Sequence, residues 1–249
     1  MRRKLTINGL TYLAEYRDQD VNGIFLPLID EWSRLREQVG RRVVVLLAAP
    51  PGTGKTTLAH VLTELGNERQ DRVSFQALGM DGFHFSNEYL DSHTIVEDGE
   101  RKTLRQRKGA PFTFDVNALS AALRDARLES PRPWPDYSRV LHDVVPGVLP
   151  ITGDVLIVEG NYLLLDAPSW RDLARLADCT VFLSAEESFL RERLISRKVA
   201  GGMDPQSAKA WYQASDGRNV SAVLERRLPA DIELRVKADG GIEECSVFM

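Results

Sequence analysis

The stretch of sequence that decides the fold is VVVLLAAPPGTGKTT, residues 43–57. Its first six residues, Val43–Ala48, are all apolar and rich in β-branched side chains, a run typical of a strand buried on both faces of a parallel sheet. A glycine-rich segment follows at once, and the periodicity of a helix then runs from about Lys55 to Leu65. The order of strand, glycine-rich loop and helix predicts a loop that binds phosphate groups.

This loop offers three kinds of phosphate ligand. Gly52 and Gly54 allow tight wrapping, so that backbone N–H groups converge on phosphate oxygens, and the following helix adds its N-terminal dipole. Lys55 is expected to reach the β- and γ-phosphates of a nucleotide, and the Thr56 hydroxyl to ligate Mg²⁺. Ala49 stands where the motif G-x-x-x-x-G-K-[ST] has its first glycine, so the match is imperfect. The residues expected to contact the nucleotide are Pro51, Gly52, Thr53, Gly54, Lys55, Thr56 and Thr57.

Two carboxylates follow other expected strands. Asp81 comes after Arg72–Leu78, and Glu159 ends the apolar run Val155–Val158. Ligands of an open parallel sheet lie beyond the carboxyl ends of its strands, so both side chains are expected near the phosphate loop. Asp81 is then a candidate base for the proton of a substrate hydroxyl, and Glu159 a candidate Mg²⁺ ligand, directly or through water. The plain alternatives are a turn residue before Gly82 and a surface acid at a strand end.

The rest of the chain has the pattern of an α/β protein. Further strands are expected at Thr180–Leu183 and Ile232–Val236, with helices between the strands. The sequence predicts a P-loop NTPase fold: a parallel sheet of about five strands flanked by helices, in one domain of residues 41–249. Apolar residues at helical spacing between Ile24 and Val39 predict an N-terminal helical extension, residues 1–40, that Gly40 ends. The other helical patterns cover Val116–Leu128, Ser169–Leu176, Ala185–Val199 and Pro205–Gln213.

Composition narrows the class of protein. The net charge of −4 argues against a dedicated nucleic-acid binder, which usually carries a basic domain. Cys179 and Cys245 have no metal-ligand spacing, so a reducing, cytoplasmic compartment is the simplest expectation. The longest apolar stretch, Val43–Ala49, is far shorter than the roughly 18 residues that a membrane helix needs. No apolar segment follows the basic Met1–Lys4, as one would in a secretory signal. A soluble protein without a membrane partner is expected.

Six motifs spread along the chain share one likeness. They are PPGTGKTT (Pro50–Thr57), MDGFH (Met80–His84), KGAPFTFD (Lys108–Asp115), YSR (Tyr137–Arg139), VEGNY (Val158–Tyr162) and RER (Arg191–Arg193). Together they resemble the P-loop kinases of the uridine kinase and phosphoribulokinase superfamily, which also contains bacterial pantothenate kinase. Within it the chain looks most like the nucleoside/nucleotide kinase-like or fructose-transport-associated branch. The resemblance runs from about Val43 to Val236.

The resemblance implies ATP as the phosphoryl donor and Asp81 in the family's catalytic-base position. It also implies that Lys108–Asp115 and Pro135–His142 line the pocket of the phosphate acceptor. Uridine kinases carry Tyr-Asp-His where this chain has Tyr137-Ser138-Arg139, which makes a sugar or sugar phosphate at least as good an acceptor as a pyrimidine nucleoside. The residues expected to contact the acceptor are Asp81, His84, Lys108, Phe112, Tyr137, Arg139, His142 and Asn161.

Cationic residues are expected to complete the catalytic set. Arg193 and Arg197 lie four apart on a predicted helix and therefore share a face. This suits a lid, about residues 186–203, that neutralises the charge of a moving phosphoryl group. Leu190 and Leu194 could pack the lid down. A solvated charged face is the alternative.

Two further segments have open roles. The basic run Arg101–Lys108 could bind an anionic substrate, a regulator or only water. In the resemblance, Asp216–Asn219 approaches the nucleotide base, so Arg218 and Asn219 are candidate adenine contacts. A plain helix-capping turn is the equal alternative for that segment.

The predicted function is ATP-dependent transfer of the γ-phosphate to a hydroxyl of a small molecule: a sugar, sugar phosphate or nucleoside. One alternative is a regulatory or mechanical P-loop ATPase, although ring-forming AAA proteins usually end their Walker-B strand in Asp-Glu and this strand ends in Glu159-Gly160. Another is a nucleotide-binding sensor, against which Lys55, Thr56 and Asp81 argue. The identity of the acceptor stays open. So does a homodimer, because the N-terminal helix could pack on its own core or on a second subunit.

Overall fold

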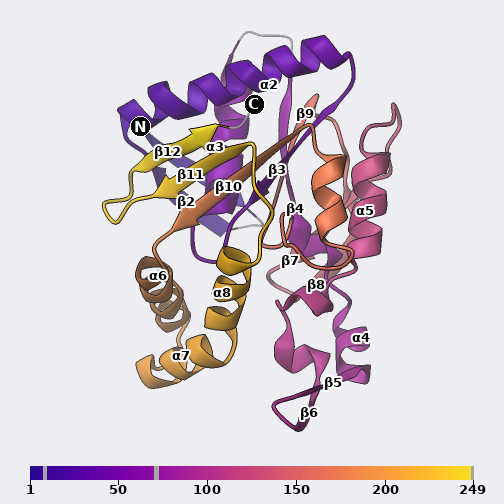
Figure 1. Cartoon of the computed structure of the whole chain (residues 1–249), viewed down its shortest axis with the longest axis vertical. Helices are drawn as coiled ribbons and strands as arrows, with labels where there is room; N and C mark the ends of the chain where they lie inside the picture. Colours follow the sequence, from indigo (N-terminus) through magenta and orange to yellow (C-terminus); the bar gives the residue numbers. More distant parts are fainter. Residues whose placement is uncertain (8–9, 70–72, 248–249) are drawn as a thin grey trace.

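The protein is built on one six-stranded sheet with the strand order β12-β11-β10-β3-β9-β4 (Figure 1). The structure is a computed structural model that describes residues 1–7, 10–69 and 73–247. Five strands are parallel, and β12 runs antiparallel to β11 at one edge. The strands are β3 (Val43–Ala48), β4 (Phe75–Gly79), β9 (Val155–Gly160), β10 (Cys179–Ala185), β11 (Ile232–Val236) and β12 (Ile242–Val247). All five predicted strands are present, and β12 is an addition.

Helices cover both faces of this sheet. Every residue of β3 is buried. Val43, Val45 and Leu47 belong to the apolar core under α2 (Leu26–Val39) and α3 (Lys55–Glu68), while the alternate residues of β3 belong to a second core under α5 (Val116–Asp125) and the 3₁₀ helix η5 (Arg171–Leu176). A strand with two buried faces must be apolar throughout, which explains the uninterrupted run in the sequence.

The N-terminal segment differs from the helical extension predicted for residues 1–40. It opens with an antiparallel hairpin of β1 (Arg2–Ile7) and β2 (Leu10–Glu15). Helix follows only from there on, as α1 (Asp18–Asp20), the π-helix η1 (Val21–Phe25) and α2. The hairpin forms because Leu5 and Ile7, at alternate positions of β1, and Ala14 of β2 bury their side chains in the same core as α3. Gly40 ends α2 as predicted, in the left-handed conformation with φ 63°.

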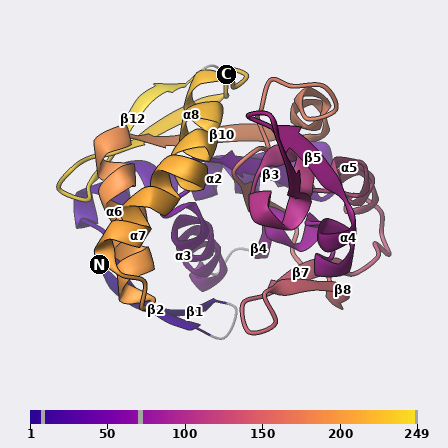
Figure 2. The ribbon, with the colours of Figure 1, turned by 90° about the horizontal axis from the view of Figure 1, so that it is seen from below.

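Smaller elements lie beyond the carboxyl ends of the parallel strands. Figure 2 shows them on two sides of α3. One side carries α4, β5 and the β7–β8 hairpin, and the other carries α6 and α7. Their bounds are η2 (Met80–Phe83), α4 (Asn87–Ser92), β5 (Thr94–Glu97), β6 (Glu100–Thr103), η3 (Leu104–Arg107), η4 (Pro111–Thr113), β7 (Trp134–Ser138), β8 (Asp143–Leu149), α6 (Glu187–Ala200), α7 (Pro205–Trp211), η6 (Tyr212–Asp216) and α8 (Gly217–Glu225).

Within the described ranges, none of the helices has both the length and the apolar composition to span a bilayer.

Candidate phosphoryl-transfer site

The glycine-rich loop has the geometry that the sequence predicts. Gly52 and Gly54 have φ values of 90° and 95°, in the left-handed region that favours glycine, and α3 begins at Lys55 immediately after them. The Thr53 hydroxyl closes the turn by donating to the Pro50 carbonyl oxygen over 2.9 Å. Ala49, at the position of the motif's first glycine, is fully buried and does not have a positive φ. Its methyl group therefore fits, and the departure from the motif does not disturb the loop.

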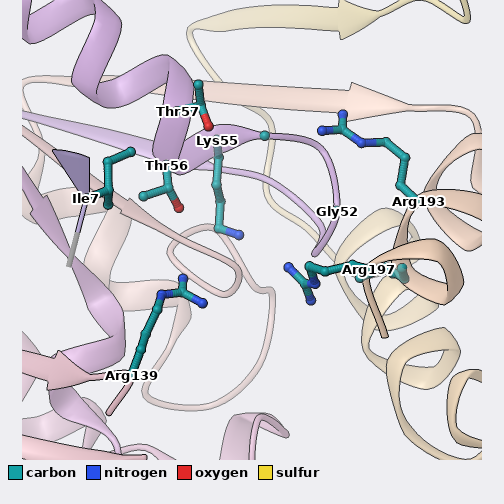
Figure 3. Close-up of a pocket in the computed structure, with 10 residues that line it drawn as sticks. Ile7, Gly52, Lys55, Thr56, Thr57, Arg139, Arg193 and Arg197 are labelled. Carbon is teal, nitrogen blue, oxygen red and sulfur yellow. The ribbon is translucent and has the colours of Figure 1, made fainter. Parts of the chain in front are cut away.

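A cavity of about 330 Å³ opens over this loop and is lined by four cationic side chains (Figure 3). The amino group of Lys55 and the guanidinium groups of Arg139 and Arg197 point toward a common space. Arg193 contributes from the other side of the loop, where its Nη1 donates to the Thr53 carbonyl oxygen over 3.3 Å. So many positive charges around backbone N–H donors suit a polyphosphate.

Helix α6 is packed directly on the loop. Leu190 and Leu194 are buried, as the sequence suggests. A Cβ on Gly52 would lie 3.1 Å from Leu194 Cγ, so the helix and the loop touch. Arg193 and Arg197 share the face of α6 that lines the cavity. Burial lowers the pKa of the Arg193 guanidinium, since removal from water disfavours its charge.

The two residues expected to hold Mg²⁺ are in contact. The Thr56 hydroxyl donates to Glu159 Oε1 over 2.9 Å. Burial raises the pKa of Glu159, and the nearby Asp81 charge raises it further while Lys55 opposes the shift. A hydroxyl and a carboxylate are the oxygen ligands that Mg²⁺ accepts, with waters and nucleotide phosphates completing its shell. Among the described residues there is no group of three or more histidine, cysteine or acidic side chains placed so that it could hold a metal ion. This donor set therefore fits Mg²⁺ rather than a metal held by protein ligands alone.

Asp81 lies at the same edge of the sheet. It belongs to η2, which directly follows β4, and its side chain is exposed. In the parallel pair β4 and β9, Gly79 is opposite Glu159, so the two carboxylates come from neighbouring strand ends. Gly82 fixes η2 against β7, because a Cβ there would lie only 2.2 Å from the Pro135 carbonyl oxygen.

Aromatic and polar groups lie around His84, three residues after Asp81. The His84 ring lies 3.7 Å from that of Phe114 and 5.5 Å from that of Tyr137, measured between ring centroids. Its Nδ1 is 2.9 Å from the Asp81 carbonyl oxygen, and its buried Nε2 has no hydrogen-bond partner among the described residues. Burial lowers the pKa of His84, so the neutral ring is favoured. The Nε2 atom thus has a hydrogen-bonding capacity that no described residue uses.

Lys108 adds a cation to this group. Its Nζ donates to Asn87 Oδ1 over 2.7 Å and to the His142 carbonyl oxygen over 2.9 Å, and it lies 4.9 Å from the centre of the Tyr137 ring. His142 therefore meets Lys108 through its backbone rather than its imidazole. Asn161 directly follows β9, and its buried Oδ1 also has no partner among the described residues.

Three predicted residues lie elsewhere. Phe112, Arg218 and Asn219 line a separate cavity of about 450 Å³ that shares no lining residue with the loop cavity. Arg218 is also engaged there by Glu97 at 3.3 Å and Asp98 at 3.0 Å.

The helix-capping turn considered for Asp216–Asn219 is wrong. The π-helix η6 runs without a break into α8 at Gly217. A Cβ on Gly217 would lie 3.0 Å from the Tyr212 carbonyl oxygen, so glycine serves the tight π-helical backbone and does not end the helix.

The part that the N-terminal hairpin takes in the site was not predicted from the sequence. Ile7 lines the loop cavity. A second cavity, of about 610 Å³, lies behind the loop and is lined by Tyr16 together with Thr53, Phe189 and Asp239. The alternation of Leu5 and Ile7 is the one sequence signal that could have suggested a half-buried strand here.

Comparison with known proteins agrees with this geometry. The chain is 41% identical over 241 residues to the uncharacterized protein YggC of Escherichia coli K12, covering 96% of this chain and 98% of YggC. It is 32% identical to a "putative uridine kinase" of Schizosaccharomyces pombe, covering 78% of this chain and 83% of that protein. A crystal structure of a "putative fructose transport system kinase" from Silicibacter sp. TM1040 superposes with a TM-score of 0.69 at 31% identity, covering 81% and 97% of the two chains. The chain matches no family model.

The parallel sheet, the glycine-rich loop and the carboxylates at the neighbouring strand ends define a P-loop kinase. The chain belongs to the P-loop kinase family that includes the putative uridine kinase and the pantothenate kinases to which it is similar.

Proposed function

We propose that this protein transfers the γ-phosphate of Mg-ATP to a hydroxyl group of a small molecule: a sugar, a sugar phosphate or a nucleoside. One observation carries the proposal. The exposed Asp81 carboxylate follows the strand next to the one that ends with Glu159. Glu159 accepts a hydrogen bond from Thr56, which lies in the first turn of the helix after the phosphate loop. A base, a metal-ligand pair and a phosphate cradle at one edge of a sheet are the parts that phosphoryl transfer needs.

Each residue has a role that follows from its chemistry. Asp81 accepts the proton of the acceptor hydroxyl as its oxygen forms a bond to the γ-phosphorus, while the bond from that phosphorus to the ADP oxygen breaks. Lys55 and Arg197, which point into the loop cavity, neutralise the three oxygens of the moving group. Thr56 and Glu159 hold Mg²⁺, which when bound neutralises phosphate charge. Helix α6, within the segment 186–203, acts as a lid that completes this cationic shell.

We further propose that the nucleoside of ATP occupies the cavity of about 610 Å³ behind the loop. This cavity shares Thr53, Gly54 and Thr57 with the glycine-rich loop, and the aromatic rings of Tyr16 and Phe189 suit a flat base. The arrangement favours it over Arg218 and Asn219, whose cavity shares no residue with the loop.

The acceptor is proposed to bind on the opposite side of Asp81. His84 Nε2 and Asn161 Oδ1 are buried polar atoms without a hydrogen-bond partner among the described residues. The Tyr137 ring lies beside the His84 ring. Buried atoms of this kind discriminate strongly between ligands that do and do not satisfy them. They suit a molecule rich in hydroxyl groups.

The proposal is tested by ADP release with Mg-ATP across sugars, sugar phosphates, nucleosides and pantothenate. With the best acceptor, Asp81→Asn is expected to reduce turnover by about 10²- to 10⁴-fold and Arg197→Gln by a smaller factor, while ATP affinity changes little. The matched control is Asp172→Asn, since this acid is exposed on η5 and pairs with Arg175. Equal losses of turnover and ATP affinity would contradict the assignment. ATP hydrolysis without an acceptor, unaffected by Asp81→Asn, would favour the ATPase alternative.

A further inference from the structure

Some cations of the basic run Arg101–Lys108 form ion pairs with carboxylates, and others do not. Arg107 is buried, with its Nε 2.9 Å from Glu97 and its Nη1 donating to the Ala214 carbonyl oxygen. Lys102 lies within 3.9 Å of Glu97 and 3.7 Å of Glu100. Carboxylates of the β5–β6 hairpin thus balance the charges of these two residues.

Arg105 and Lys108 have no such balance. Among the residues that the structure describes, neither lies within ion-pair distance of a carboxylate, and the Nη1 atom of Arg105 is buried without a hydrogen-bond partner. The Nζ of Lys108 is held by the neutral oxygens of Asn87 and His142 alone. Arg105 lies in η3 and Lys108 directly follows it, with its N–H donating to the Arg105 carbonyl oxygen over 3.2 Å, so two cations lie close in the chain without a counterion.

The pKa of Lys108 reflects this setting. Burial lowers it most, and the positive charge of Arg105 lowers it further, whereas Asp143, Asp81 and Asp91 act in the opposite direction. Of these acids, Asp143 accepts hydrogen bonds at its Oδ1 from the backbone N–H groups of Asn87 and Val144. These acids therefore affect the pKa of Lys108 through their charge but form no ion pair with it.

The two cations lie on the acceptor side of Asp81. Lys108 lies over the ring of Tyr137, which lies beside His84 and two residues before Arg139 of the loop cavity. The γ-phosphate has its own cations in Lys55 and Arg197, which point into the loop cavity. A second cationic pair is not needed for a neutral acceptor. It fits an acceptor that brings negative charge of its own.

We propose that the acceptor is a sugar or polyol that already carries a phosphate monoester, and that Arg105 and Lys108 bind this phosphate. The inference rests on the proposed kinase function and narrows its acceptor. A phosphate monoester carries up to two negative charges near neutral pH, which matches two cations, whereas a carboxylate would leave one of them unbalanced. The arginine offers a paired donor fork, and the lysine a compact charge.

The test compares acceptors that differ by this phosphate. ADP release is measured with fructose, fructose 1-phosphate and fructose 6-phosphate, with ribose and ribose 5-phosphate, and with gluconate as the carboxylate. A phosphorylated member is expected to be used at least 100-fold better, as kcat/KM, than its unphosphorylated counterpart. Arg105→Gln and Lys108→Gln should each raise its KM by about 10- to 100-fold, with little change in kcat or in the KM for ATP.

Matched variants separate binding from folding. Arg105→Lys keeps the charge and should bring the KM back to within several-fold of the original value. Arg101→Gln changes an exposed member of the same run whose guanidinium donates to the Thr94 hydroxyl over 3.3 Å, and should leave the KM unchanged. If Arg105→Gln does not fold, as judged by its thermal transition, Lys108→Gln carries the same comparison.

The outcomes are distinct. Efficient use of an unphosphorylated acceptor, with Arg105→Gln and Lys108→Gln leaving its KM unchanged, would overturn the inference while an effect of Asp81→Asn upheld the kinase. Preference for gluconate would overturn the phosphate assignment. ATP hydrolysis that needs no acceptor and ignores Asp81→Asn would remove the proposed function and the inference with it.

Discussion

Replacing Gly82 by alanine should displace the carboxylate of Asp81, the proposed base, without changing that residue. An added Cβ at residue 82 would lie 2.2 Å from the carbonyl oxygen of Pro135 and 2.9 Å from the backbone nitrogen of Asp136. These are backbone atoms of β7, so no flexible side chain can move aside. An ordinary contact between carbon and a carbonyl oxygen is about 3.3 Å, so η2 and β7 must separate by about 1 Å. Asp81, the preceding residue, moves with η2.

A displacement of this size has two separate costs. Misplacing a catalytic group by about 1 Å can cost about 100-fold in rate, which is the expected loss in kcat for Gly82→Ala. The strain of the crowded contact should also destabilise the fold by about 1–3 kcal/mol. ATP affinity should change little, because the atoms nearest to the added Cβ belong to β7 and not to the glycine-rich loop or helix α6.

Gly66→Ala is the matched control. Its added Cβ would lie 2.4 Å from the Phe75 ring in the core between α3 and β4, so the crowding is similar but lies away from Asp81. Steric strain of about 1–3 kcal/mol would be offset by about 1 kcal/mol of improved helix propensity. Thermal unfolding and steady-state kinetics should then show two destabilised proteins, of which only Gly82→Ala is slow. Turnover of Gly82→Ala within twofold of the original, or an equal loss in Gly66→Ala, would refute the reasoning.

Two further predictions concern the metal pair and the nucleoside cavity. Because burial raises the pKa of Glu159 above its ordinary 4.5, the folded state holds this proton more tightly than the unfolded one, and the charged form costs stability as the pH rises. Glu159→Gln should therefore raise the melting temperature at pH 7, and this difference should vanish as the pH falls below about 4.5. Mg-dependent turnover should drop in the same variant. A difference in melting temperature that does not depend on pH would contradict the prediction. Ala238→Trp should fill the cavity behind the loop and raise the KM for ATP about 10-fold or more without altering the KM for the acceptor. Arg218→Ala should leave both KM values unchanged. The reverse pattern would indicate that adenine binds in the cavity beside α8 that Arg218 lines.

The parallel sheet was predictable from sequence because its strands are buried on both faces. The bounds of β3 and β11 agree with the predicted Val43–Ala48 and Ile232–Val236. The elements that were missed are strands with little apolar signal. β12 (Ile242–Val247) includes Glu243 and Glu244, and the β7–β8 hairpin contains prolines, which argue against a strand when only the sequence is considered.

The candidate site divides in the same way. Lys55, Thr56 and Glu159 were predictable because each is fixed by its own strand end or helix start, and the 2.9 Å contact of the last two follows from strand order. Arg218 could not be placed, because its position depends on the π-helix that carries α7 into α8. Ile7 and Tyr16 reach the two cavities through packing between segments far apart in the chain, and only the alternation of Leu5 and Ile7 hints at the strand that carries Ile7.

The wall of the cavity behind the loop joins the two ends of the described chain. The Ile242 N–H donates to Asp20 Oδ2 across 222 residues of sequence, and Arg17 pairs with Asp239 beside it. Contacts of such high sequence separation are costly in loop-closure entropy and tend to form late in folding. During synthesis, Arg17 and Asp20 are made long before their partners Asp239 and Ile242, so this wall cannot form until the later segment has been made. A growing chain would therefore contain β3, β4, β9 and β10 before residues 238–242 could complete the wall of this cavity.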